Sequence, residues 1–351
     1  MEAMSPIETR AVWTSSMMKN DSSWVYLLDS GDISELKSAL AACRKAKKNV
    51  PYTTKEDFRI PSLASKIGKI KSQLIDGFGV ALIKGLPAAE FSKEDAGIIF
   101  WGIGSHLGRA TAQNAYGDVL GHVWNLGRDH TKDTASRGYQ SKLRLNFHTD
   151  TTDVVGLLCL RKAKKGGVSS VASSAAIHNE LLRSKPELLR ELYKNFYWDQ
   201  RDEEPEGELP YVVQPVFINN MNRVFCRFVD RYIRSAQRFE SVPRLTMLQI
   251  EALDAVAALA NSDEFRLDMD LEPGDMQFLM NYSVLHSRTA YEDFPELDKK
   301  RHLLRLWLFC NEFDQSRPVI YSQRNRIVDS WLKVPRAPVY DVNELMGVTG
   351  D

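Results

Sequence analysis

The stretch PGDMQFLMNYSVLH, residues 273–286, joins a turn, a strand and a histidine. Pro273–Asp275 combines residue types that favour a tight turn, and the apolar run Met276–Met280 predicts a buried strand. His286 follows closely on that strand, and binding side chains are commonly presented just past strand ends. The stretch therefore predicts a sheet with a candidate functional residue at its edge.

Further strand-like runs fill the later part of the chain and set the fold class. Besides Met276–Met280, we predict strands over residues 79–85, 143–147, 154–160, 168–172, 212–218, 224–228 and 303–309. We predict helices over residues 33–47, 61–77, 92–107, 175–183, 186–194 and 246–261. Since strands and helices do not alternate regularly, a doubly wound parallel sheet is disfavoured. We expect a mainly β fold with flanking helices, namely a double-stranded β-helix, or cupin-like jelly roll.

The pattern along the chain predicts a single domain, residues 1–351, with segments attached to one core. In residues 110–142 the periodicity fades and Gly, Asn, Asp and Ser accumulate, which predicts a lid-like loop. The other expected parts are a helical N-terminal segment (1–75), a jelly-roll core (76–315) with a helical insert (230–265), and a C-terminal extension (316–351).

Composition excludes several classes of partner. Lys plus Arg and Asp plus Glu both number 46, so net charge gives no case for binding nucleic acid or a membrane surface. No apolar run reaches the ~18 residues that span a bilayer, and the N-terminus lacks the apolar core of a signal peptide. The 4 cysteines show no paired spacing, which favours buried free thiols in a reducing cytoplasm.

A second short stretch, LNFHTD at residues 145–150, supplies two further candidate metal ligands. His148 and Asp150 are spaced so that a strand directs both side chains to the same face. Together with His286 they provide two imidazoles and one carboxylate, the ligand set of a non-haem iron(II) site with open coordination positions. A lone His-X-Asp is weak evidence, because a surface ion pair gives the same pattern. A zinc hydrolase using the same three ligands stays open at this point.

Two arginines downstream strengthen the metal interpretation. Arg305 lies within the apolar run 303–309, where a buried charge without an anionic partner would be costly. An inward-facing Arg305 beside a metal-binding carboxylate satisfies this requirement. Arg301 stands before the same run, and the alternative for it is a solvated strand start. A guanidinium in either place can hold a carboxylate with good geometry.

These motifs, taken in order, resemble one known family. GFGV (77–80), FHTD (147–150), GGVS (166–169), PGD (273–275) and HSRTAY (286–291), with the arginine pair, are similar to the taurine dioxygenase-like superfamily of Fe(II)- and 2-oxoglutarate-dependent oxygenases, which includes clavaminate synthase-like proteins. The resemblance implies that His148, Asp150 and His286 bind iron. It implies that Arg301 and Ser169 bind the distal carboxylate of 2-oxoglutarate. It further implies that Arg305, Asn146 and Phe147 contact the substrate.

The resemblance also implies an activity. Fe(II), 2-oxoglutarate and O2 would be used to oxidise an unactivated C–H bond of a small, anionic, carboxylate-bearing substrate, such as an amino acid or a natural-product intermediate. Hydroxylation is the default outcome, with desaturation and cyclisation left open. The alternatives are a non-catalytic metal-binding jelly-roll protein and a protein-modifying oxygenase. Neither the substrate nor the oligomeric state follows from these residues.

Overall fold

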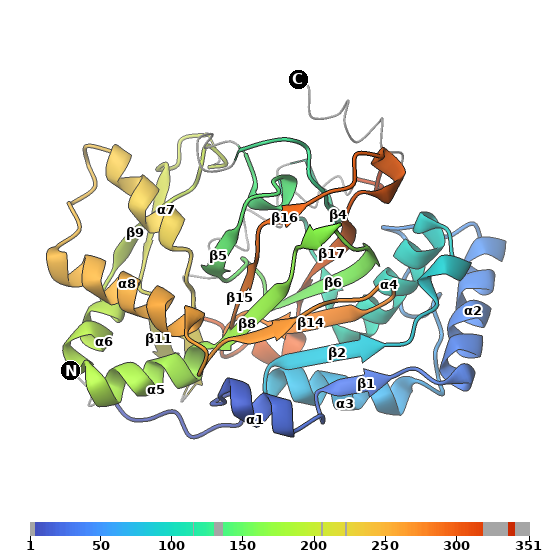
Figure 1. The fold of residues 1–351 in the computed structure, drawn as a ribbon, viewed down its shortest axis with the longest axis horizontal. Coiled ribbons are helices and arrows are strands. Elements are labelled where there is room, and N and C mark those ends of the chain that lie inside the picture. Colours follow the sequence, from blue (N-terminus) through green and yellow to red (C-terminus); the bar gives the residue numbers. More distant parts are fainter. Residues whose placement is uncertain are drawn as a thin grey trace.

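The computed structural model describes residues 4–114, 116–129, 136–204, 206–221, 223–318 and 336–340. Two sheets face each other, with helices gathered at both ends of the molecule (Figure 1). This arrangement confirms the expected jelly roll with flanking helices. Parts of the expected lid (115 and 130–135) and of the C-terminal extension (319–335 and 341–351) lie outside the described residues.

The larger sheet has seven strands and the smaller sheet has four. In spatial order the larger sheet contains β1 (Val25–Leu27), β2 (Val80–Lys84), β14 (Met276–Met280), β6 (Val154–Arg161), β17 (His302–Phe309) and β3 (Arg109–Ala110), with β4 (Leu120–Val123) also paired to β17. The smaller sheet contains β13 (Leu267–Met269), β8 (Ser169–Ser173), β15 (Val284–Arg288) and β5 (Leu145–His148). Every pair is antiparallel except β1 with β2.

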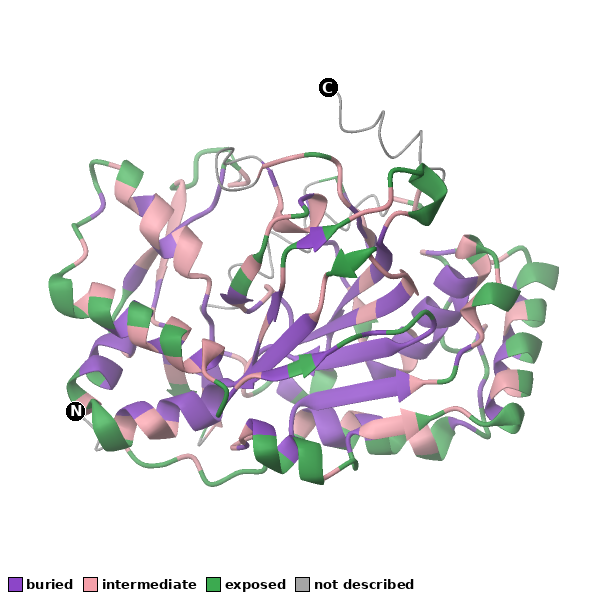
Figure 2. Cartoon of the chain, in the orientation of Figure 1, coloured by how far each residue is buried: buried purple, intermediate pink, exposed green. Residues whose placement is uncertain are grey.

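Alternation along the strands separates two apolar layers. In β17, Leu304 and Leu306 contribute to the layer under the helices, whereas Leu303 and Trp307 contribute to the layer between the two sheets. Figure 2 shows the central strands of the larger sheet (β2, β14, β6 and β17) mostly buried, while the edge strand β1 is partly exposed and the helices expose their outer faces. The strand pattern therefore directs every second side chain of the larger sheet toward the smaller one.

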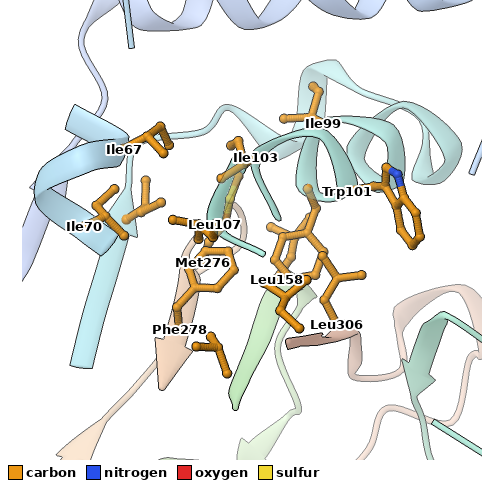
Figure 3. Close-up of a cluster of buried hydrophobic side chains, with 14 of the residues drawn as sticks. Ile67, Ile70, Ile99, Trp101, Ile103, Leu107, Leu158, Met276, Phe278 and Leu306 are labelled. Carbon is orange, nitrogen blue, oxygen red and sulfur yellow. The ribbon is translucent and has the colours of Figure 1, made fainter. Parts of the chain in front are cut away.

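Two helices, α3 (Ala64–Ile75) and α4 (Lys93–Leu107), cover the outer face of the larger sheet, and α2 (Ser30–Lys45) packs against α4. The side chain of Ser92 accepts a hydrogen bond from the backbone N–H of Asp95 and so caps α4. Figure 3 shows the contact: Ile70 and Ile103 from the helices pack with Phe278 and Leu158 from the sheet.

A long insert joins β8 to β13 and has its own apolar cluster. It contains α5 (Ser174–Ser184), α6 (Pro186–Leu192), β9 (Phe196–Asp199), β10 (Tyr211–Gln214), β11 (Phe217–Asn220), β12 (Arg223–Cys226), α7 (Asp230–Ser235) and α8 (Met247–Asn261). The expected helical insert, residues 230–265, falls inside this longer segment. The strand predicted over residues 212–218 is wrong, because β10 and β11 belong to separate two-stranded ladders. Pro215 stands between them and has no N–H to donate to a ladder.

The remaining short elements are α1 (Ser15–Asn20), η1 (Ala88–Glu90), η2 (Gly138–Gln140), β7 (Lys165–Gly166), β16 (Tyr291–Glu292), η3 (Ala236–Arg238), η4 (Leu297–Lys299) and η5 (Asn311–Phe313). All four cysteines are buried free thiols. Among the residues that the structure describes, none of the helices combines the length and apolarity that crossing a membrane requires.

Candidate metal centre

The two histidines expected to bind a metal lie opposite each other on neighbouring strands. His148 on β5 is the direct cross-strand partner of His286 on β15, and their ring centroids are 4.3 Å apart. A register shift follows this pair, so β5 carries an extra residue beside the site. Such bulges re-aim side chains and are frequent next to active sites. The register therefore brings together two imidazoles that are remote in the sequence.

Asp150 completes the cluster from the loop that leaves β5. One carboxylate oxygen lies 3.9 Å from Nε2 of His148, and the other lies 3.8 Å from Nε2 of His286. One donor atom from each of the three residues lies within 4.8 Å of the other two. Two nitrogen donors and one oxygen donor, all turned toward one point, fit a single divalent ion with open coordination positions.

The protonation states of the histidines suit metal binding. Nδ1 of His148 lies 2.8 Å from the carbonyl oxygen of Asn146. Donation to that carbonyl places the proton on Nδ1 and leaves the Nε2 lone pair free, the usual arrangement behind a metal-binding histidine. Burial lowers the pKa of His286 to about 3, so this imidazole is neutral and can donate a lone pair at neutral pH.

The carboxylate of Asp150 is held ionised and in a fixed orientation. Burial alone would favour the neutral acid, but Arg305 and the two imidazoles outweigh it, and the pKa of Asp150 lies below its usual value. Nε1 of Trp307 donates to Oδ2 over 2.9 Å. The side-chain oxygen of Asn281 accepts the backbone N–H of Asp150 at 3.0 Å. These contacts set the direction in which the carboxylate faces the histidines.

The loop around Asp150 is also tied to the insert. The backbone N–H of Thr149 donates to the carbonyl of Phe228 at 2.8 Å, and the N–H of Phe228 donates to the Thr149 hydroxyl at 3.1 Å. Arg227 donates to the hydroxyl of Thr151 at 3.0 Å. We call this set of contacts the Thr149–Phe228 clasp. It fixes the metal-side loop against β12 and the turn that follows it.

A buried ion pair holds the other end of the same loop. Asp153 is 0% exposed and accepts the backbone N–H of Cys310 at 2.7 Å. It also accepts hydrogen bonds from the Tyr282 hydroxyl and from both Nε and Nη2 of Arg317. Asp153 therefore fastens the start of β6 to the chain that follows β17.

Arg301 lies immediately before β17 and is 5% exposed. Its guanidinium lies over the ring of Tyr291, 5.1 Å from the centroid, and its Nη1 has no hydrogen-bond partner. Ser169, on β8, is buried and donates to the side-chain oxygen of Gln277 at 3.1 Å. A buried guanidinium with unused donors needs an anion. The structure thus offers a place for a carboxylate near Arg301.

Gly167 leaves the space that the Arg301 side chain occupies. It has φ +75°, and a Cβ added there would lie 2.8 Å from Nε of Arg301. We therefore expect Gly167→Ala to displace Arg301 and to weaken 2-oxoglutarate binding by about tenfold, the effect of losing a hydrogen bond to a charged group. Anaerobic titration of the Fe(II) protein measures this. Gly207→Ala is the matched control, because it has φ +82° and open space around it; equal losses in both variants would contradict the role of the space.

Arg305 lies at the boundary between the metal centre and a cavity. Its Nη1 is 3.9 Å from Oδ2 of Asp150, as the sequence predicts for an inward-facing arginine. Its guanidinium lies between the rings of Tyr139 and Trp307, at 4.6 and 5.0 Å from their centroids, and its Nε donates to Gln113 at 2.6 Å. The cavity has a volume of about 430 Å³ and is lined by Arg305 together with residues of the expected lid.

The other two candidate substrate residues lie differently. Asn146 is exposed next to His148 and contributes its carbonyl oxygen to that histidine. Phe147 is 2% exposed and packs in the apolar cluster of the insert, together with Leu285 and Ala172. Because neighbouring strand residues face opposite sides, Phe147 points away from His148. The structure does not bring Phe147 to the metal centre.

Sequence reasoning assigned no role to four residues that the structure places here. Trp307 and Asn281 hold Asp150, and Arg288 and Tyr291 lie around Arg301. One signal was available for Trp307, since alternation from Arg305 along one strand puts it on the same face. The contacts of the other three depend on pairing between distant strands and loops, which the local sequence does not encode.

Comparison with known proteins agrees with this geometry. The model of the taurine catabolism dioxygenase TauD, TfdA family matches residues 45–307. FR-33289 synthase of Streptomyces rubellomurinus is 32% identical over 305 residues, which cover 86% of this chain and 90% of that protein. An asparagine oxygenase solved with Fe(II), 3-hydroxyasparagine and succinate has a TM-score of 0.63 at 16% identity, covering 82% of this chain and 93% of its own. The oxygenase OrfP, solved with Fe and α-ketoglutaric acid, has a TM-score of 0.57 at 16% identity, covering 81% and 94%.

The fold and the convergent ligand set define a non-haem iron dioxygenase that uses Fe(II), 2-oxoglutarate and O2. A jelly roll and a two-histidine, one-carboxylate cluster are both needed for this class, and both are present. The extent of the family match and the identity to FR-33289 synthase show that the chain belongs to the taurine catabolism dioxygenase TauD, TfdA family. The expectation of an oxygenase, rather than a non-catalytic binding protein, is confirmed.

Proposed function

We propose that this dioxygenase oxidises an unactivated C–H bond of a small anionic molecule, with hydroxylation as the default outcome. In this proposal His148, Asp150 and His286 hold Fe(II), and Arg301 and Ser169 hold the distal carboxylate of 2-oxoglutarate. The observation that carries it is the convergence of the three ligand atoms within 4.8 Å, beside a buried arginine with an unused donor. A zinc hydrolase would leave that arginine without a purpose.

When bound, Fe(II) with 2-oxoglutarate and O2 supplies the oxidant, and 2-oxoglutarate leaves as succinate and carbon dioxide. The protein supplies position and shielding. Trp307 and Asn281 fix the carboxylate that faces the ion. The apolar layer between the sheets excludes water from one side of the centre. Tyr139 covers Arg305 on the side of the expected lid.

The substrate class rests on Arg305. Its guanidinium faces the metal centre and borders the cavity of about 430 Å³, a volume that suits a small molecule. An arginine there favours a substrate with a carboxylate or another acidic group. The 3-hydroxyasparagine in the solved asparagine oxygenase is an acid of that size, which supports an amino acid or a related natural-product intermediate. The free buried thiols fit a reducing compartment, so we place the enzyme in the cytoplasm.

Succinate release tests the proposal directly. The purified protein, supplied with Fe(II), 2-oxoglutarate and O2, is assayed against amino acids and amino-acid-derived acids, with their amides in parallel. We expect at least one acid to raise succinate release above the substrate-free rate and to gain one oxygen atom by mass. Anaerobic addition of 2-oxoglutarate to the Fe(II) protein should also give a visible charge-transfer band. Absence of both signals would contradict the proposal.

Arg305→Leu tests the anionic substrate separately. We expect turnover of the acid to fall by about tenfold to a hundredfold, because a hydrogen bond to a charged group is lost, while turnover of the amide falls much less. Fe(II) affinity is measured in parallel, because Arg305 also lies 3.9 Å from Asp150. Equal losses on acid and amide at unchanged Fe(II) affinity would remove Arg305 from substrate recognition.

A further inference from the structure

Arg288 is a second buried arginine close to Arg301, and the function proposed above gives it no role. It is the last residue of β15 and is 5% exposed. Its direct partner on β8 is Ser169. Side chains of directly paired residues lie on the same face of a sheet, with Cβ atoms about 4.5–5.5 Å apart. The Cβ of Arg288 therefore lies next to Ser169, whose hydroxyl we propose binds 2-oxoglutarate.

The two arginines share one aromatic ring. The guanidinium carbon of Arg288 is 4.7 Å from the centroid of Tyr291, and that of Arg301 is 5.1 Å from the same centroid. Around Tyr291, two positive charges therefore lie in one buried cluster of side chains. Two like charges away from water repel each other and lose hydration, so the arrangement is costly unless an anion joins them.

Among the described residues, Asp293 lies near enough to attract both guanidinium groups, but no carboxylate joins them. In the part of the chain that the structure describes, neither Arg288 nor Arg301 forms an ion pair with a carboxylate. Nη2 of Arg288 donates to the carbonyls of Ser141 and Leu143. Asp293 accepts the backbone N–H of Arg301 at 2.9 Å, not its guanidinium.

Several guanidinium donors in this cluster are left without partners. They are Nε and Nη1 of Arg288 and Nη1 of Arg301. Buried polar groups are nearly always hydrogen-bonded, so this many unused donors in one place indicate a ligand rich in acceptor oxygens. A carboxylate matches them in charge and in size.

We propose that Arg288 binds the distal carboxylate of 2-oxoglutarate together with Arg301 and Ser169. The inference rests on the function proposed above, and it deepens it by naming a second arginine for the cosubstrate. Arg288 then has two tasks on opposite sides of its guanidinium. One nitrogen holds the chain that leads into β5, and the others face the cosubstrate.

A cosubstrate analogue separates these two tasks. 2-Oxovalerate has the length of 2-oxoglutarate but carries a methyl group in place of the distal carboxylate. Binding of each compound to the Fe(II) protein is measured by calorimetry without O2, so no turnover is involved. We expect Arg288→Gln to weaken 2-oxoglutarate binding by about tenfold to a hundredfold and 2-oxovalerate binding by less than about twofold. Arg288→Lys, which keeps the charge, should lose less than Arg288→Gln.

Arg266→Gln is the matched control, because Arg266 pairs with Asp263 and Asp268 and not with the residues around Tyr291. This variant should leave the affinities for 2-oxoglutarate and 2-oxovalerate unchanged. Binding of 2-oxovalerate also reports whether each variant is folded. If Arg288→Gln and Arg288→Lys weaken the binding of 2-oxoglutarate and of 2-oxovalerate equally, Arg288 only holds Ser141 and Leu143. If the two variants bind both compounds as tightly as the unmodified protein does, Arg288 does not contact the cosubstrate. If the unmodified Fe(II) protein binds neither 2-oxoglutarate nor 2-oxovalerate, the proposed function itself is contradicted.

Discussion

His286→Ala is expected to abolish succinate formation coupled to substrate oxidation. The variant loses one of three ligand atoms, and the remaining pair, His148 and Asp150, cannot hold the ion in the same geometry. Loss of groups that merely orient a ligand costs 10–100-fold in metal affinity, so we expect loss of the ligand itself to weaken Fe(II) binding by more than about a hundredfold. Chelator competition measures the affinity, and His148→Ala should behave in the same way.

His106→Ala is the control for this experiment. His106 lies on α4, at the helix-covered face of the larger sheet, and its Nε2 is 2.8 Å from the carbonyl oxygen of Phe58. We expect His106→Ala to keep its Fe(II) affinity, because the residue is remote from the cluster. Retention of Fe(II) affinity and coupled turnover in His286→Ala would end the assignment of the metal centre.

Asp153→Ala is expected to lower the free energy of unfolding by about 3–5 kcal/mol, the usual cost of removing one partner of a buried ion pair. The substitution leaves the guanidinium of Arg317 and the hydroxyl of Tyr282 without their acceptor in the interior. It also frees the backbone N–H of Cys310. Chemical denaturation followed by tryptophan fluorescence gives the change in unfolding free energy.

The chain offers a close control for the same arginine. Asp314 also pairs with Arg317, at 3.0 Å, but its side chain is 61% exposed. Exposed ion pairs contribute about 0–1 kcal/mol, so we expect Asp314→Ala to change the unfolding free energy by no more than about 1 kcal/mol. Similar losses in the two variants would contradict the importance of burial.

The sequence predicted the parts of the site that depend on local pattern. His148 and Asp150 are two residues apart in one short motif, and the turn and strand before His286 follow from local sequence, so the candidate ligand set could be predicted. The inward orientation of Arg305 could be predicted for a different reason, because a charged side chain inside an apolar run needs an anionic partner. The Fe(II) and 2-oxoglutarate expectations followed from the same residues and from the resemblance of the motifs.

What the sequence did not predict depends on pairing between distant segments. The register that sets His148 opposite His286 also creates a bulge in β5, and Phe147 turns toward the insert instead of the metal. Arg288 belongs to the motif HSRTAY, but its position beside Ser169 arises only when β15 pairs with β8. Pro215 could have revealed the break between β10 and β11, because proline has no N–H to offer a ladder.

The Thr149–Phe228 clasp has a consequence for engineering. The insert provides none of the three proposed metal ligands, yet two hydrogen bonds join Phe228 to Thr149, the residue just before Asp150: one between backbone groups and one accepted by the Thr149 hydroxyl. Replacing the insert with that of a relative, as a route to new substrates, therefore also replaces one side of the Thr149–Phe228 clasp beside the proposed metal ligand Asp150. Chimeras that keep residues 226–229 of the recipient preserve these hydrogen bonds, and we expect chimeras that replace these residues to change metal affinity together with specificity.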